Sequence, residues 1–232
     1  YHLCCSPFDD NAVTKLRKIK SRDKKPLAVM FLNSSEIEKY CFMTKKEREL
    51  IESKQTPIVL LERKPSSICK NVYKDSRMLG VFIPYTPLHH ILIHRCGPLV
   101  MTSANLSDIP IIKDDDVVYK VFGTKVDGVL HHNRKIVVAL DDSVAQISSG
   151  KVQIIRRARG YVPLPIYLNN EANLNKKHIF ATGSQQKVAL CLAKNNLAYL
   201  SQYLGDMDKE ESIKRYSETY EYMKNLFNVI PK

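Results

Sequence analysis

Short apolar runs alternate with amphipathic stretches through the first 125 residues of the chain. An apolar run that is short and bounded by polar or turn residues is typical of a buried strand. The runs that meet this description, and that we predict to be strands, are residues 1–5, 27–31, 57–61, 80–85 and 98–101.

The stretches between these runs carry helix signals. Asp9 or Asp10 can cap a helix whose apolar residues Val13, Leu16 and Ile19 fall at helical spacing. Further helices are predicted at residues 44–53, which open with a Thr-x-x-Glu capping box, and at residues 88–94 and 114–122. Strands that alternate with helices in this way predict an α/β fold.

The pattern changes near residue 127 to short strands and turns. Strands are predicted at residues 128–131, 136–140, 143–147 and 151–157, and a turn at residues 148–150. We therefore expect a meander attached to the α/β body. Residues 164–175 are rich in proline and asparagine and lack periodicity, which predicts a linker and a domain boundary.

Three strands and a helix are predicted after this linker. The strands are residues 179–183, 188–192 and 197–200, and the helix begins near Lys209. Its predicted apolar face consists of Ile213, Tyr216, Tyr220, Met223 and Phe227. A βββα unit of this size cannot bury its own sheet well, so we expect it to be the first piece of a larger domain.

Composition narrows the class of protein. A chain of 232 residues with 44% hydrophobic residues can bury a core, and no apolar run approaches the roughly 18 residues of a membrane span. With no signal-peptide pattern either, a cytoplasmic protein without membrane contact is expected. The six cysteines form no C-x-x-C pair, which favours reduced core residues over a disulfide framework. The chain opens in what resembles the second half of a strand, so a fragment of a longer protein is expected.

The formal charge of +12 is compatible with a nucleic acid, a membrane surface or a small polyanion as partner. Aromatic residues make up only 8% of the chain and tryptophan is absent, which argues against stacking on exposed bases. The adjacent histidine pairs at residues 89–90 and 131–132 diverge on a helix or strand, so no protein metal site is predicted.

The segment with the most chemical information is the predicted strand at residues 98–101, which ends in Thr102, Ser103, Ala104 and Asn105. Hydroxyl, carboxamide and backbone N–H groups at the end of a strand can bind phosphate, although the same residues also form ordinary turns. Other polar motifs accompany this segment: the basic cluster of Lys20, Arg22 and Lys25, the sequence Asp-Asp-Ser-Val at residues 141–144, and Arg-Arg-Ala-Arg-Gly-Tyr-Val-Pro at residues 156–163.

Taken in order, these motifs resemble the YrdC-like domain, in the variant found in the HypF carbamoyltransferases of [NiFe]-hydrogenase maturation. The resemblance implies an α/β fold with a twisted mixed sheet over residues 1–165, without its first strand. Residues 201–206, Ser-Gln-Tyr-Leu-Gly-Asp, resemble the start of the Kae-like domain of HypF. That resemblance implies that residues 176–232 are a partial βββα unit of actin and sugar-kinase-like architecture, truncated at its C-terminus.

The resemblance also implies a reaction. The YrdC-like domain joins carbamate, released from carbamoyl phosphate, to AMP from ATP with loss of pyrophosphate, and the carbamoyl group then passes to the C-terminal cysteine of HypE. Mg²⁺ is expected to arrive with ATP, and zinc is expected only in parts of the full-length protein that are absent from this chain.

The residues matched to the family motifs divide into two groups. Those expected to act in catalysis are Lys20, Arg22, Ser103 and Asn105, and those expected to bind the nucleotide are Lys25, Thr102, Ser143, Arg156 and Arg159. Joining carbamate to a phosphate requires positioning and charge neutralisation, which fixed cations supply. Arg22 can hold phosphate oxygens bidentately, whereas Lys20 acts as a point charge. For Arg157, a surface salt bridge is the alternative, because alternate strand residues face opposite sides.

Two other functions stay open at this stage. A threonylcarbamoyl-AMP synthase-like enzyme would need threonine for pyrophosphate exchange. An RNA-binding YrdC-like module, of the kind that binds double-stranded RNA, would show steeply salt-dependent binding without competition from nucleotides.

Overall fold

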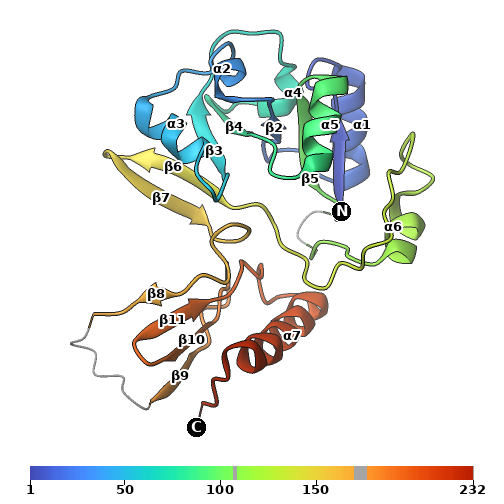
Figure 1. Ribbon diagram of the computed structural model, residues 1–232. Coiled ribbons are helices and arrows are strands. Elements are labelled where there is room, and N and C mark those ends of the chain that lie inside the picture. Colours follow the sequence, from blue (N-terminus) through green and yellow to red (C-terminus); the bar gives the residue numbers. More distant parts are fainter. Residues whose placement is uncertain (107–108, 170–176, 232) are drawn as a thin grey trace. The chain divides into compact units, whose positions relative to one another are not determined.

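The computed structural model describes residues 1–106, 109–169 and 177–231, which form two compact units (Figure 1). The first unit comprises most of residues 1–155, and the second comprises most of residues 156–232 together with residues 109–110. Part of the predicted linker, residues 170–175, lies outside the described residues.

A seven-stranded sheet organises the first unit, with the strand order β1-β5-β2-β4-β3-β6-β7. The strands are β1 (His2–Cys5), β2 (Ala28–Met30), β3 (Ile58–Glu62), β4 (Met78–Phe82), β5 (Leu99–Ser103), β6 (Val144–Ser148) and β7 (Lys151–Arg156). The pairs β2–β4 and β3–β6 are parallel, whereas β1–β5, β2–β5 and β3–β4 are antiparallel. The prediction of a mixed sheet is therefore confirmed.

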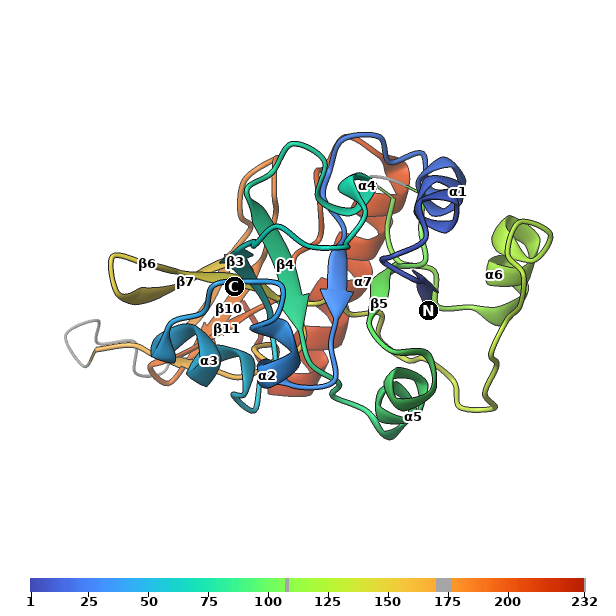
Figure 2. The same cartoon turned by 90° about the horizontal axis from the view of Figure 1, so that it is seen from above.

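Helices cover the two faces of this sheet unequally. The larger core contains Val29, Val59, Val81 and Val100 and receives side chains from five helices: α1 (Asp10–Lys20), α2 (Ser34–Ile37), α3 (Lys45–Ile51), α4 (Lys70–Tyr73) and α6 (Asp115–Phe122). A smaller core with Met30, Phe82, Leu99 and Met101 receives Ile93 of α5 (Pro87–Cys96). Figure 2 shows α1 and α5 on opposite sides of β5.

Most predicted elements of this unit are confirmed with small shifts of their ends. Asp9 caps α1 by accepting from the amides of Asn11 and Ala12, and the capping box of Thr44 and Glu47 is present at α3. Strand β5 continues two residues beyond its predicted end and includes Thr102 and Ser103. The sequence patterns did not predict the short helices α2 and α4.

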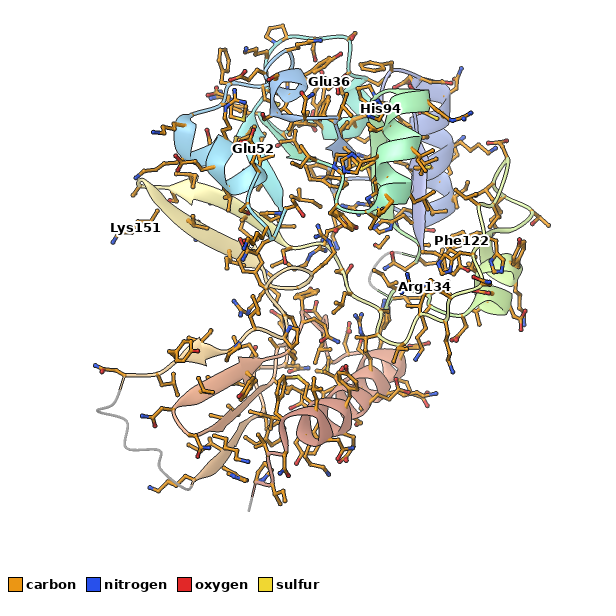
Figure 3. The ribbon with its side chains drawn as sticks, in the orientation of Figure 1. Glu36, Glu52, His94, Phe122, Arg134 and Lys151 are labelled. Carbon is orange, nitrogen blue, oxygen red and sulfur yellow. The ribbon has the colours of Figure 1, made fainter. Side chains whose placement is uncertain are left out.

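The predicted meander is only partly correct. Residues 144–156 form the β6–β7 hairpin, with Lys151 near its tip (Figure 3). The strands predicted at residues 128–131 and 136–140 are wrong, because these described residues form no strand. Leu130 and Val137 are 61% and 69% exposed, so the apolar residues that suggested strands have no core to cover.

The second unit contains a four-stranded antiparallel sheet and one long helix. The strand order is β8-β11-β10-β9, with β8 (Ile166–Tyr167), β9 (His178–Ala181), β10 (Cys191–Lys194), β11 (Leu197–Leu200) and helix α7 (Glu210–Phe227). Strand β8 comes from the predicted linker and pairs with β11, so this sheet has four strands among the described residues instead of the predicted three.

Two details of the second unit correct the sequence prediction. Strand β10 begins at Cys191 instead of residue 188, because Val188 forms an isolated bridge with Gly205. Ile213 is 52% exposed and does not belong to the buried face of α7, which includes Ser212, Thr219 and Met223. No helix among the residues described is long and apolar enough to cross a membrane.

Candidate functional site at the end of strand β5

The polar segment predicted from the sequence lies where β5 ends. Thr102 is 8% exposed, and Ser103 is the last residue of the strand, opposite His2 of β1 in the antiparallel register. The Ser103 hydroxyl donates to Asn105 Oδ1 over 2.7 Å, and the Asn105 amide N donates to the Ser103 carbonyl over 3.1 Å. These bonds hold the Asn105 side chain beside the strand end.

Lys20 connects the end of α1 to this segment. Its side chain is 1% exposed, and its Nζ donates to Asn105 O over 2.8 Å, to Asn105 Oδ1 over 3.0 Å, and to Ser103 O. The pKa of Lys20 falls from 10.5 to about 8, mainly because of burial and also because of the positive charge of Arg22, while Asp141 opposes the shift. The ammonium group therefore holds the 103–105 segment in place.

Arg22 contacts the same strand end from the turn that follows α1. Its Nη2 donates to Pro26 O over 2.6 Å and its Nε to Lys25 O over 3.3 Å, while Nη1 lies 3.5 Å from Thr102 Oγ1. Lys25 is exposed in this turn. The structure thus brings Lys20 and Arg22 together with Thr102, Ser103 and Asn105, which lie about 80 residues further along the chain.

The Asp-Asp-Ser motif precedes β6, and the side chain of its Asp142 contacts His2 of β1. Asp142 Oδ2 lies 3.3 Å from His2 Nε2, and His2 is paired in register with Ser103. Ser143 is fully buried, and its carbonyl accepts from the Ile58 amide over 2.8 Å. No cluster of three or more His, Cys, Asp or Glu residues that could hold a metal ion occurs in residues 1–106, 109–169 and 177–231.

Arg156, Arg157 and Arg159 lie where the first unit ends and the second begins, so their position relative to the group around β5 stays a prediction. Arg156 is the last residue of β7, and Arg159 forms an isolated bridge with Val162; both are half-buried. Arg157 donates through Nη2 to Tyr161 O over 2.9 Å and to Leu164 O over 3.1 Å. The alternative of a surface salt bridge for Arg157 is therefore wrong: the side chain holds main-chain carbonyls, and burial lowers its pKa.

Sequence reasoning missed two residues of this region, Arg17 and His2. Arg17 is 4% exposed and donates to main-chain carbonyls of the turn that carries Arg22 and Lys25. The helical spacing contained a signal, because positions 13, 16, 17 and 20 share one face of a helix and the last two of them are basic. Two basic residues on the apolar face of a helix need buried acceptors.

Two family models match successive parts of the chain. The Sua5/YciO/YrdC model, described as telomere recombination, matches residues 1–158, and the model of the HypF Kae1-like domain matches residues 174–232. The carbamoyltransferase HypF of Synechocystis sp. is 39% identical over 234 residues, which cover all of this chain and 30% of the relative. The chain thus spans less than a third of the length of that curated relative.

A solved structure and a further curated relative agree with this assignment. A full-length HypF, crystallised in a phosphate- and nucleotide-bound form, matches 99% of this chain and 30% of its own with a TM-score of 0.94 and 40% identity. A putative threonylcarbamoyl-AMP synthase of Methanocaldococcus jannaschii is 29% identical over 168 residues, covering 68% of this chain and 79% of the relative. The chain therefore belongs to the Sua5/YciO/YrdC family, in the HypF form in which Kae1-like sequence follows the YrdC-like domain.

Proposed function

We propose that the site at the end of β5 makes carbamoyl-adenylate as part of a HypF-type carbamoyltransferase. An oxygen of carbamate, derived from carbamoyl phosphate, bonds to the α-phosphorus of ATP, and the bond from that phosphorus to the bridging oxygen breaks to release pyrophosphate. The carbamoyl group is then passed on to the C-terminal cysteine of HypE. The nucleotide and phosphate bound by the full-length HypF structure support this proposal.

The reaction requires the protein to position the two substrates and to supply positive charge, since no covalent intermediate with the protein is needed. Arg22 and Lys25 share one turn and would neutralise the phosphates that leave as pyrophosphate. Lys20 adds a buried charge behind the 103–105 segment. Arg156 and Arg159, which match a family motif, are proposed as further nucleotide contacts, and Ser143 is proposed as a hydroxyl contact beside β6.

Asn105 has a defined orientation for ligand binding. Its Oδ1 accepts from Lys20 Nζ over 3.0 Å and from the Ser103 hydroxyl over 2.7 Å, and these two bonds fix the plane of the side-chain amide. We propose that this amide donates to a phosphate or carbamoyl oxygen. Thr102, which lies 3.5 Å from Arg22 through its hydroxyl, borders the same position.

Mg²⁺ would enter as part of the ATP substrate, held largely by phosphate oxygens and water. The protein offers Asp141 and Asp142 in this region, but the Asp142 carboxylate already lies 3.3 Å from His2 Nε2. This arrangement fits a metal that the substrate carries better than a metal that the protein holds by itself.

The observation that carries the proposal is the contact group formed by Lys20, Arg22, Thr102 and Asn105. Isothermal titration of the chain with ATP and Mg²⁺ tests it. We expect micromolar binding by the wild type and at least a tenfold loss in Arg22→Ala and in Asn105→Ala. Arg134→Ala and Asn11→Ala, which remove an exposed arginine and an exposed asparagine elsewhere, are the matched controls and should bind like the wild type.

Absence of ATP binding in a sample with a cooperative unfolding transition would overturn the proposal. Where binding is found, pyrophosphate exchange with carbamoyl phosphate in the full-length protein tests the chemical step. The matched threonylcarbamoyl-AMP synthase makes a threonine-dependent reaction the second candidate. Exchange that requires threonine would favour that candidate, whereas exchange that requires carbamoyl phosphate would favour the HypF reaction.

A further inference from the structure

Arg17 has an unusual position for an arginine. It lies on the buried face of α1, one turn before the end of the helix, and is only 4% exposed. Its guanidinium makes five hydrogen bonds, all to main-chain carbonyl oxygens: Nε to Asn71 (2.6 Å), Nη1 to Arg22 (2.8 Å), Lys25 (3.1 Å) and Asp23 (3.3 Å), and Nη2 to Val72 (3.3 Å).

These acceptors belong to two separate segments of the chain. Asn71 and Val72 lie in α4, whose Val72 carbonyl also accepts from the Leu27 amide over 2.9 Å. The other three acceptors lie in the turn at residues 22–25, which follows α1 directly. Arg17 therefore fastens this turn to a helix that packs in the main core of the first unit.

The turn is held by the backbone and the side chain of Arg17 and by the side chain of Arg22. The main-chain carbonyl of Arg17 accepts from the Arg22 amide over 3.0 Å, so the same residue holds the turn through both its backbone and its side chain. The Lys25 carbonyl accepts from Arg17 Nη1 and also from Arg22 Nε over 3.3 Å. The orientation of the Arg22 guanidinium is thus coupled to Arg17 through a shared acceptor.

We propose that Arg17 is a positioning residue, which fixes the turn at residues 22–25 so that Arg22 and Lys25 point toward the phosphates of the bound nucleotide. The inference rests on the proposed function of this site. Arg17 itself does not touch the ligand, because its guanidinium is buried behind the turn and committed to carbonyl oxygens. It acts by ordering two cationic side chains before the nucleotide arrives, which reduces the entropy that binding would otherwise cost.

Arginine suits this role better than lysine. A guanidinium offers five N–H donors in a rigid plane, whereas an ammonium offers three donors from one nitrogen. In Arg17→Lys the charge is kept, but at least two of the five carbonyls lose their partner, and one nitrogen cannot reach both α4 and the turn. The substitution therefore separates the geometry of the side chain from its charge.

The test combines two measurements on the full 232-residue chain. The first is amide hydrogen exchange of the ligand-free wild type and of Arg17→Lys, followed at Arg22 and Leu27, whose amides flank the turn. The second is titration with ATP and with AMP, each with Mg²⁺. The control is Arg48→Lys, an arginine of the same unit whose side-chain partners are Ser34, Glu38 and Glu52. Arg17→Gln, which keeps two N–H donors without a buried charge, replaces Arg17→Lys if the lysine variant does not fold.

We expect faster exchange at Arg22 and Leu27 in Arg17→Lys, and ATP affinity that falls by about 10- to 100-fold while AMP affinity changes less than threefold. In the Arg22→Ala background the same substitution should have much less effect on ATP. A role confined to folding would weaken ATP and AMP equally and would not depend on Arg22.

Three results would overturn the inference: unchanged exchange in the turn, unchanged ATP affinity despite faster exchange, or equal loss for ATP and AMP. Failure of the wild type to bind either nucleotide is a different result, because it removes the proposed nucleotide site and with it the ligand that Arg17 is argued to serve. The exchange measurement needs no ligand, so it distinguishes the two failures.

Discussion

Lys20 combines nearly complete burial with an ammonium group that contacts Ser103 and Asn105. Burial lowers its pKa to about 8, so the side chain is protonated at pH 7 and loses its charge as the pH rises through 8. If this charge helps to hold the phosphates, ATP affinity should fall by about tenfold between pH 7 and pH 9.5. Titration calorimetry at several pH values measures this dependence.

Lys20→Met is the matched variant, because it keeps an unbranched chain but has no charge to lose. We expect its ATP affinity to be weaker at pH 7 and to vary much less with pH than that of the wild type. Parallel pH profiles for the two proteins would contradict a role for the Lys20 charge. The same pKa shift has a consequence for stability: between pH 8 and pH 10.5 the unfolded chain binds more protons than the folded one, so the free energy of unfolding due to this residue rises with pH.

Single residues differ in how far their roles could be predicted from the sequence. Lys20, Arg22 and Asn105 were identified because they occur in ordered family motifs, and the structure places them together. The contacts of Arg17 could not be predicted, since all its partners are main-chain carbonyls whose positions depend on the fold. The pairing of His2 with Asp142 likewise joins residues 140 positions apart.

At the scale of elements, the end of α1 determines where Lys20 and Arg22 point. Ser21 is the C-cap between them and has φ 52° and ψ 46°, in the left-handed region that favours glycine. We expect Ser21→Gly to raise the free energy of unfolding by about 0.5–1 kcal/mol, because relief of strain exceeds the extra entropy of glycine in the unfolded chain. Denaturant unfolding measures the change, and ATP affinity should stay within twofold of the wild type.

The control for this prediction is Ser35→Gly, in which glycine replaces an exposed serine inside α2. Glycine within a helix should lower the free energy of unfolding by several tenths of a kcal/mol. A loss of stability in Ser21→Gly similar to that in Ser35→Gly would show that the left-handed conformation at residue 21 is not a source of strain.

Elements with a strong local signal were predicted well, and elements that depend on distant partners were not. The capping box of Thr44 and Glu47 and the cap at Asp9 are local, and both are present. Strand β8 was missed because two residues carry no periodicity, and it exists only through its pairing with β11. Residues 128–140 showed the opposite error, because the apolar runs on either side of the polar residues 131–135 have no neighbouring strand to pair with.

At the scale of the whole molecule, the two units have separate cores. The two core clusters of the first unit contain residues up to Ile147, whereas the cluster of the second begins at Phe180. The order of motifs along the chain predicted this succession of a YrdC-like and a Kae1-like segment, because the family resemblance extends beyond any single element. The boundary at residue 165 stays a prediction. In the structure the first unit ends at Ile155, and β8 begins directly after residue 165.

Separate cores predict that residues 1–165 fold and bind nucleotide without the rest of the chain. This fragment contains both core clusters of the first unit and the contact group of Lys20, Arg22 and Asn105. We expect its ATP affinity to lie within about twofold of that of the whole chain, measured by titration calorimetry. A folded fragment that binds ATP much more weakly would show that residues 166–232 contribute to the nucleotide site.

The same fragment decides the role of Arg156 and Arg159, which cluster with the second unit but precede residue 165. If they contact phosphates as the family resemblance implies, Arg156→Ala and Arg159→Ala in the fragment should each weaken ATP by about three- to tenfold, because each removes one cation from a polyanion. Arg134→Ala, which removes the same charge at an exposed position, controls for the overall charge of the protein. Equal effects of all three substitutions would mean that only net charge matters, and Arg156 and Arg159 would then be removed from the proposed site.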